Sequence, residues 1–135
     1  MNDVVYPAIL TYEDDVIYVS LPNFSDEKCL TYGDTLEEAI KSAKEVLTLD
    51  LSDLLQEKKE FPKPLDIKEL KTNLDENQEV IYVSLWLPYE LSLIKTIYKK
   101  KTLSIPTWLD LLATYKNINF SQVLKEALME KLNIK

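Results

Sequence analysis

The sequence predicts an α+β protein made of two parts. Three observations predict it. Short runs rich in β-branched and aromatic residues are typical of strands, and a long segment among them repeats apolar residues at helical spacing. The residues from 98 onward are predicted to form one strand followed by two helices, an arrangement that differs from the one predicted for residues 1–87.

Four runs in the first part are predicted strands: residues 4–10, 16–21, 29–32 and 80–87. Pro7 lacks an N–H and therefore marks an edge or a strand start. The acidic residues 12–15 predict a turn between the first two strands, and Gly33 is expected to supply a positive-φ turn after the third. The hexapeptide VIYVSL occurs at 16–21 and again at 80–85. The flanks do not match, so we take this repeat as coincidence.

A helix of about twenty residues is predicted to begin after Thr35, which caps it in a capping box with Glu38. Its apolar stripe should cover one side of the small sheet. The apolar stripe of this helix consists of Leu36, Ala39, Ile40, Ala43, Val46 and Leu47, continued by Leu54 and Leu55.

Residues 61–77 are polar and contain two prolines, so they are predicted to form a loop.

The predicted domains are residues 1–87 and 98–135, joined by a linker over 88–97 that contains a helical turn or two. A strand is expected over 97–105. Pro106 is expected at the first position of the next helix, where its missing N–H costs nothing, and that helix should end near residues 116–117. Asn119 caps the last helix, with Gln122 at the third helical position.

The second part is too small to bury a core alone. A lone strand also leaves two unpaired edges. Both problems disappear if two copies pair their strands antiparallel and interlock their helices, so residues 98–135 are predicted to form a homodimer. Association into higher oligomers through the first part stays open. The apolar residues that need cover are Leu103, Ile105, Trp108, Leu111, Leu112, Val123, Leu124, Leu128 and Leu132.

The sign of the net charge changes near residue 97, close to the predicted boundary between the two domains. The net charge is −7, but residues 97–135 carry seven lysines against three acids, and residues 1–96 carry nine lysines against twenty acids. An acidic body with a basic tail indicates one cationic and one anionic partner. Ordinary scatter of charge is the alternative.

Several absences restrict the chemistry. The chain has no histidine, no arginine and a single glycine, which removes histidine-based acid–base catalysis, most zinc sites and glycine-rich phosphate loops. No apolar run is long enough to span a bilayer, and residues 1–7 do not resemble a signal peptide. Cys29 has no partner for an internal disulfide. We therefore expect a cytoplasmic protein without membrane contact, cofactor or catalytic activity. Cys29, Trp86 and Trp108 are expected in apolar cores, with Trp108 packing the dimer.

Residues 99–134, KKKTLSIPTWLDLLATYKNINFSQVLKEALMEKLNI, resemble a ribbon–helix–helix DNA-binding domain. By this resemblance the two-stranded ribbon enters the major groove of operator DNA. Lys100, Thr102 and Ser104 would read base edges there. Lys99 and Lys101 would meet phosphates, as would the helix N-terminus formed by Asn119, Phe120 and Ser121. The alternatives are a lysine-protected edge strand and a plain helix cap.

Residues 6–47 resemble the N-terminal domain of HicB antitoxins. The motif is a strand ending in LPN, a short loop, and the turn Cys29, Thr31, Gly33, Asp34, Thr35, Glu37, Glu38 and Ala39; the family's usual Pro-Gly pair in that loop is replaced by residues 25–28. The resemblance implies a partial RNase H-like sheet with a flanking helix. It also implies a basic HicA-like ribonuclease toxin as partner, which Glu13, Asp14 and Asp15 could meet. A solvated hairpin turn is the alternative for these acids.

Together the two resemblances predict an antitoxin that blocks an mRNA-cleaving toxin and represses its own operon. One alternative is a ribbon–helix–helix repressor whose first domain senses a ligand or another protein. Another is a nuclease using two Mg²⁺ ions. It is disfavoured because Asp14, Asp15 and Asp34 fall in predicted turns and no acid lies clearly inside a strand.

Overall fold

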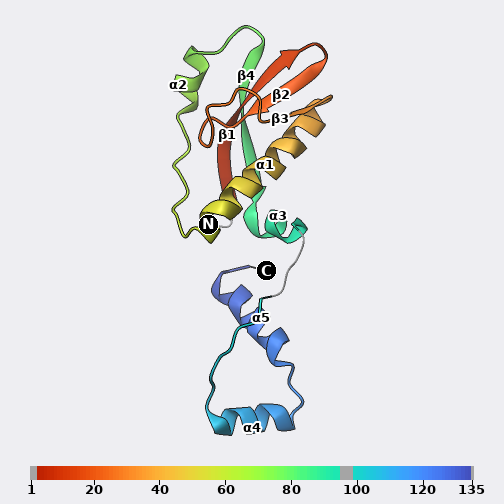
Figure 1. Cartoon of the computed structure of the whole chain (residues 1–135), viewed down its shortest axis with the longest axis vertical. Helices are drawn as coiled ribbons and strands as arrows, with labels where there is room; N and C mark the ends of the chain where they lie inside the picture. The colour runs from red at the N-terminus through yellow and green to blue at the C-terminus, as the bar shows by residue number, and fades with distance from the viewer. Residues whose placement is uncertain (1–2, 95–98, 135) are drawn as a thin grey trace. The chain divides into compact units, whose positions relative to one another are not determined.

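The computed structural model describes residues 3–94 and 99–134 and divides into two compact units, residues 1–94 and 95–135. It confirms the α+β class: the first unit holds a four-stranded antiparallel sheet with helices, and the second holds two helices (Figure 1). No helix within the described ranges is long and apolar enough to cross a membrane.

The sheet contains all four predicted strands, in the order β3-β2-β1-β4. Every neighbouring pair is antiparallel. The third strand is shifted by two residues from its predicted start, because residues 29 and 30 belong to the preceding loop. The strands are β1 (Asp3–Glu13), β2 (Val16–Ser20), β3 (Thr31–Gly33) and β4 (Gln78–Trp86).

Pro7 lies inside β1 rather than at its start, and the register explains why it is tolerated. β4 pairs with β1 from Asp3 onward, whereas β2 pairs with it only from Ile9. The first half of β1 therefore has a neighbour on one side only. The N–H of Tyr12 donates to the carbonyl of Asn77 at 2.9 Å, so even-numbered residues of β1 bond toward β4. The nitrogen of Pro7 faces the side that β2 does not reach, where no donor is required.

The predicted long helix is α1 (Leu36–Gln56), which packs across one face of the sheet (Figure 1). Its capping box forms: the N–H of Glu38 donates to Thr35 Oγ1 at 3.2 Å, and the Glu38 carboxylate accepts the N–H of Asp34 at 2.9 Å. Ile40 and Val46 in the predicted stripe are half-buried, and its ends at Leu36 and Leu55 are exposed. The buried helical residues are Ala39, Ala43, Leu47, Thr48 and Leu51.

The reason for Gly33 differs from the one predicted. Its φ is not positive, so the turn does not require glycine for its backbone conformation. A Cβ at this position would lie 2.3 Å from the backbone nitrogen of Ala39. Glycine is needed because the end of β3 passes directly against the first turn of α1.

The prediction of an uninterrupted loop over 61–77 is wrong. Residues beyond the prolines form α2 (Ile67–Thr72), and Asp66 caps it by accepting the N–H of Lys68 at 2.9 Å. The extended stretch before α2 is also fixed to the sheet unit. Tyr6 Oη donates to the carbonyl of Pro62 at 2.6 Å, and Asn23 Nδ2 donates to the carbonyl of Lys63 at 2.7 Å.

The predicted linker over 88–97 contains helical turns, as expected, but these turns pack on the first unit. It begins in α3 (Leu87–Leu93), where Leu87 is buried and Leu91 packs against the core. Residues 88–94 therefore belong to the first unit. Residues 95–97 of the predicted linker lie outside the described residues.

The second unit contains α4 (Thr107–Tyr115) and α5 (Phe120–Lys131), close to the predicted positions. Pro106 is the residue before α4 rather than its first helical residue. The side chain of Asn119 caps α5 by accepting the N–H of Gln122 at 3.1 Å, as predicted. Residues 99–106 have no regular secondary structure in the single chain, and residues 97 and 98 of the predicted strand lie outside the described residues.

Candidate functional site

The acidic turn between β1 and β2 is a tight two-residue hairpin loop. Glu13 pairs with Val16, and Asp14 and Asp15 between them have φ values of 50° and 63°. Positive φ at both central positions identifies a type I′ turn, whose twist matches that of the flanking strands. Aspartate tolerates this conformation better than most residues do. The fold therefore presents two adjacent carboxylates at the tip of a hairpin.

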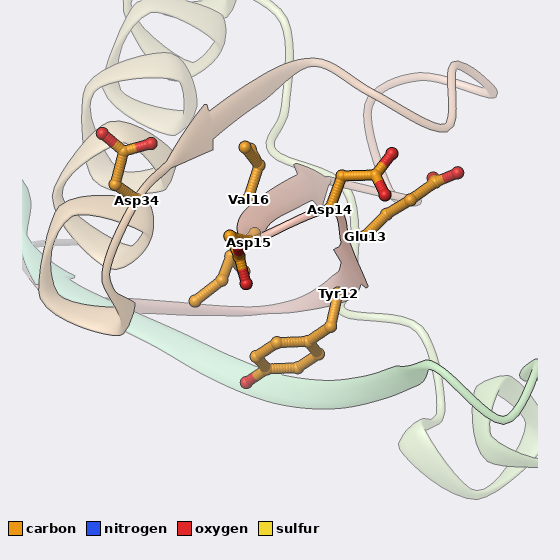
Figure 2. A pocket seen from close by; sticks show the side chains of 7 residues that line it. Tyr12, Glu13, Asp14, Asp15, Val16 and Asp34 are labelled. Atoms are coloured by element: carbon orange, nitrogen blue, oxygen red, sulfur yellow. The ribbon is translucent and has the colours of Figure 1, made fainter.

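A shallow hollow of about 460 Å³ adjoins this turn and is shared with Asp34, the residue before the Thr35 cap (Figure 2). Figure 2 shows the carboxylates of Glu13 and Asp14 pointing away from that of Asp34. No group of three or more acids, cysteines or histidines in the described ranges is arranged to hold a metal ion.

The base of the hairpin is fastened to the start of β4. Tyr12 Oη donates to Glu79 Oε1 at 2.5 Å, and Asn77 Nδ2 donates to the carbonyl of Tyr12 at 3.1 Å. Gln78 Nε2 donates to Thr11 Oγ1 at 3.0 Å. The hydrogen bond to Glu79 raises the pKa of the Tyr12 phenol, with burial and the carboxylate charge acting in the same direction. These bonds hold the acidic tip on a fixed support.

The acids at the tip form no ion pair with any of the described lysines. Lys59 and Glu57, with Nζ and Oε2 2.9 Å apart, form the single ion pair found in residues 3–94 and 99–134. Glu13, Asp14 and Asp15 consequently keep their charges available for a cationic partner. The structure thus brings these three residues together at one tip, as the sequence predicted.

In the second unit the basic and apolar residues are all accessible. No residue in the described range 99–134 is buried. Trp108 is 64% exposed and Leu128 is 53% exposed, so the expectation that Trp108 lies in a core is not met within one chain. Side chains of this kind require cover from another surface.

The predicted DNA-contacting residues fall into two groups on this unit. Lys99, Lys100, Lys101, Thr102 and Ser104 are exposed along the segment that precedes α4, and Asn119, Phe120 and Ser121 are exposed where α5 begins. The first N–H groups of a helix have no acceptor inside it. Asn119 satisfies the N–H of Gln122, which leaves the N–H groups of Phe120 and Ser121 for an outside acceptor.

Sequence reasoning missed one surface of the first unit and misplaced two of its residues. Tyr82 and Trp86 are 56% and 38% exposed on β4, and Val5 is exposed beside them on β1. The alternation in VIYVSLW contained that signal, because every second residue must lie on the face opposite α1. Cys29 and Trp86 were expected in a core, but both are exposed. The loop before β3 carries Cys29 outside the sheet, and the alternation of β4 places Trp86 on the face opposite α1.

Comparison with known proteins gives a consistent result. Residues 6–112 match a family model described as the HicB-like antitoxin of bacterial toxin–antitoxin systems. A solved toxin–antitoxin complex from Streptococcus pneumoniae contains a chain 30% identical, with a TM-score of 0.56, over 96% of this chain and 99% of that one. The antitoxin HicB of Burkholderia pseudomallei is 20% identical with a TM-score of 0.51, over 96% and 97% of the two chains, and shows the fold alone.

A curated relative matches a shorter stretch. An uncharacterised 14.9 kDa protein from the rep–hol intergenic region of Haemophilus phage HP1 is 32% identical over 66 residues. The match covers 49% of this chain and 48% of that protein, so the chain spans about half the length of this relative.

Proposed function

Because the chain belongs to the HicB-like family of bacterial antitoxins, we propose that it binds and blocks a HicA-like mRNA-cleaving ribonuclease toxin and represses its own operon. The first unit is the toxin-binding part, and residues 98–135 form a ribbon–helix–helix dimer that binds operator DNA. The related Streptococcus pneumoniae structure is a toxin–antitoxin complex, which supports a toxin as partner.

The observation that carries this proposal is the contrast in completeness between the two units. The first has a closed core and an acidic, unpaired hairpin tip. The second is basic and buries none of its described residues. An acidic folded unit suits a basic protein, because complementary charge speeds and orients association. A basic unit that is completed by its own copy suits a two-fold DNA site.

The toxin half is tested with the full chain and the basic protein encoded beside it. A triple variant, Glu13→Gln with Asp14→Asn and Asp15→Asn, removes three charges and keeps residues that favour a type I′ turn. We expect weaker and slower binding to the toxin, with a reduced dependence on salt. The matched control removes three charges elsewhere on the unit: Asp26→Asn, Glu27→Gln and Glu37→Gln. If the two triple variants bind the toxin equally well, the hairpin tip is not part of the interface.

The operator half is tested by gel-shift on the protein's own promoter, with and without the toxin. Thr102→Ala combined with Ser104→Ala should erode preference for the operator while the dimer persists. Lys99→Ala should weaken binding to all DNA alike and lower the salt slope by about one unit. Unchanged binding in both variants would mean that this segment does not read DNA.

The same assays separate the proposal from its alternative. If a saturating concentration of this chain leaves the toxin fully active while operator binding persists, the chain is a repressor whose first unit senses another protein or a ligand. A neighbouring reading frame that is short, lysine-rich and contains a histidine favours the antitoxin.

A further inference from the structure

β4 is an outer strand, and its edge away from β1 has no strand beside it in the described chain. The alternation of its backbone follows from the hydrogen bond between Tyr12 N–H and the Asn77 carbonyl, together with the register of the two strands. Odd-numbered residues of β4 bond to β1. The N–H and C=O groups of Val80, Tyr82 and Ser84 therefore point to the open edge.

The side chains beside this edge are also uncovered. Tyr82, Ser84 and Trp86 lie on the face opposite α1, and all three are exposed. The identical hexapeptide in β2 has a different environment, because β2 is an inner strand: Ser20 there is buried and Tyr18 is half-buried. The exposure of the second copy is therefore a property of its position in the sheet.

β4 lacks several of the devices that usually keep an edge strand from pairing. Such strands are commonly short, bulged, or marked by lysine or proline. β4 has nine residues and contains neither lysine nor proline. Its register with β1 is unbroken from Asp3–Trp86 to Thr11–Gln78, so no bulge twists it away. The edge is a free template for another strand.

We propose that this edge binds an extended segment of a basic protein, which adds to β4 as a fifth strand. The inference rests on the proposed function, in which that protein is the toxin. Residues 1–96 carry twenty acids against nine lysines, and β1, β4 and α3 contain four acids and no lysine. A second copy would bring the same negative charge to this edge. A basic segment instead gains charge complementarity and can lay lysine stems across Tyr82 and Trp86.

The experiment uses the full chain, the purified toxin and calorimetry. Ser84→Pro removes an outward N–H and leaves the bonds to β1 intact, a position where an edge strand accepts proline. Ser84→Ala removes the hydroxyl and keeps the N–H. We expect Ser84→Pro to weaken toxin binding by at least about tenfold, equivalent to one lost hydrogen bond to a strand partner. Ser84→Ala should stay close to wild type.

A second pair of variants keeps the test valid if the proline disturbs folding. Tyr82→Lys and Tyr82→Glu make the same loss of an aromatic ring with opposite charge, and thermal melting checks that each is folded. For a basic partner, Tyr82→Lys should bind clearly more weakly than Tyr82→Glu. Folded Ser84→Pro and Tyr82→Lys proteins that bind toxin like wild type would overturn the proposal.

Three further outcomes distinguish the possible sources of failure. If wild-type protein does not bind the toxin, the proposed function fails and the edge loses its partner with it. If wild type blocks the toxin and the edge variants do so equally, the edge proposal alone is overturned. Ser84→Pro protein that keeps toxin binding but shows a smaller oligomer by light scattering would also overturn it, because the edge would then join copies of this chain.

Discussion

The two units differ in whether one chain is enough to complete them. In the first, α1 closes over the sheet, and residues such as Leu47 and Leu51 are fully buried. In the second, α4 and α5 form and the Asn119 side chain caps α5, yet no described residue is buried. Good local signals therefore specify helices in both units, but they supply a core in only one. Local sequence signals are therefore enough to form a helix, but a complete domain also needs a surface against which the helix can bury its apolar residues.

The largest expected effect comes from truncating the core of the complete unit. Leu47→Ala removes a fully buried side chain and should lower the free energy of unfolding of the first unit by about 2–5 kcal/mol. Urea unfolding followed by Trp86 fluorescence in a Trp108→Phe background measures this unit. The loss should be the same at every chain concentration. A dependence on concentration would show that the first unit also relies on a partner.

The matched truncation in the second unit should behave differently. Leu128→Ala changes a side chain that is 53% exposed in one chain. If a second copy buries it, the midpoint of unfolding followed by Trp108 fluorescence, in a Trp86→Phe background, falls by an amount equivalent to roughly 1–3 kcal/mol. Raising the chain concentration should then partly restore the midpoint. An unfolding midpoint that changes neither with the substitution nor with the chain concentration would contradict pairing of two copies through this unit.

Much of this contrast was predictable from the sequence, and the exceptions have physical reasons. The four strands of the first unit, the capping box at Thr35, the cap at Asn119 and the acidic turn follow local rules that act over a few residues. The role of Gly33 did not follow, because the backbone of Ala39 that excludes a Cβ comes close only after α1 packs on the sheet. α2 was hidden because its six residues carry too little periodicity to outweigh two nearby prolines.

The site was predicted less completely than the fold. Glu13, Asp14 and Asp15 are adjacent in sequence, so their grouping needed only the turn. The edge of β4 required the strand order β3-β2-β1-β4, which pairs residues distant in sequence. The same hexapeptide occupies an inner and an outer strand, and composition alone does not distinguish these positions.

A smaller expected effect concerns the caps, which use the same chemistry in both units. Thr35 Oγ1 accepts the N–H of Glu38, and Asn119 Oδ1 accepts the N–H of Gln122. Thr35→Ala and Asn119→Ala should each cost about 1 kcal/mol in their own unit. The two tryptophan backgrounds described above read the two losses separately. A cap substitution that also weakened the other unit would show that the units unfold together.

The smallest expected effect comes from Asp50, on the outer part of α1. Burial and the nearby charge of Asp53 raise the pKa of Asp50 in the folded protein. A carboxyl whose folded pKa is raised favours the folded state most when it is protonated. Its contribution is therefore present below the unfolded pKa and is lost as pH rises through the window up to the folded pKa.

Asp50→Asn removes this penalty, so it should raise the stability of the first unit slightly at neutral pH and lose that advantage in acid. Urea midpoints at several pH values, read through Trp86, measure the change. Asp53→Asn is the matched control: it should recover only the part of the penalty that comes from charge, because burial is the larger cause of the shift at Asp50. The second unit should not respond to either substitution. A shift in its midpoint would mean that the charge of α1 acts on it.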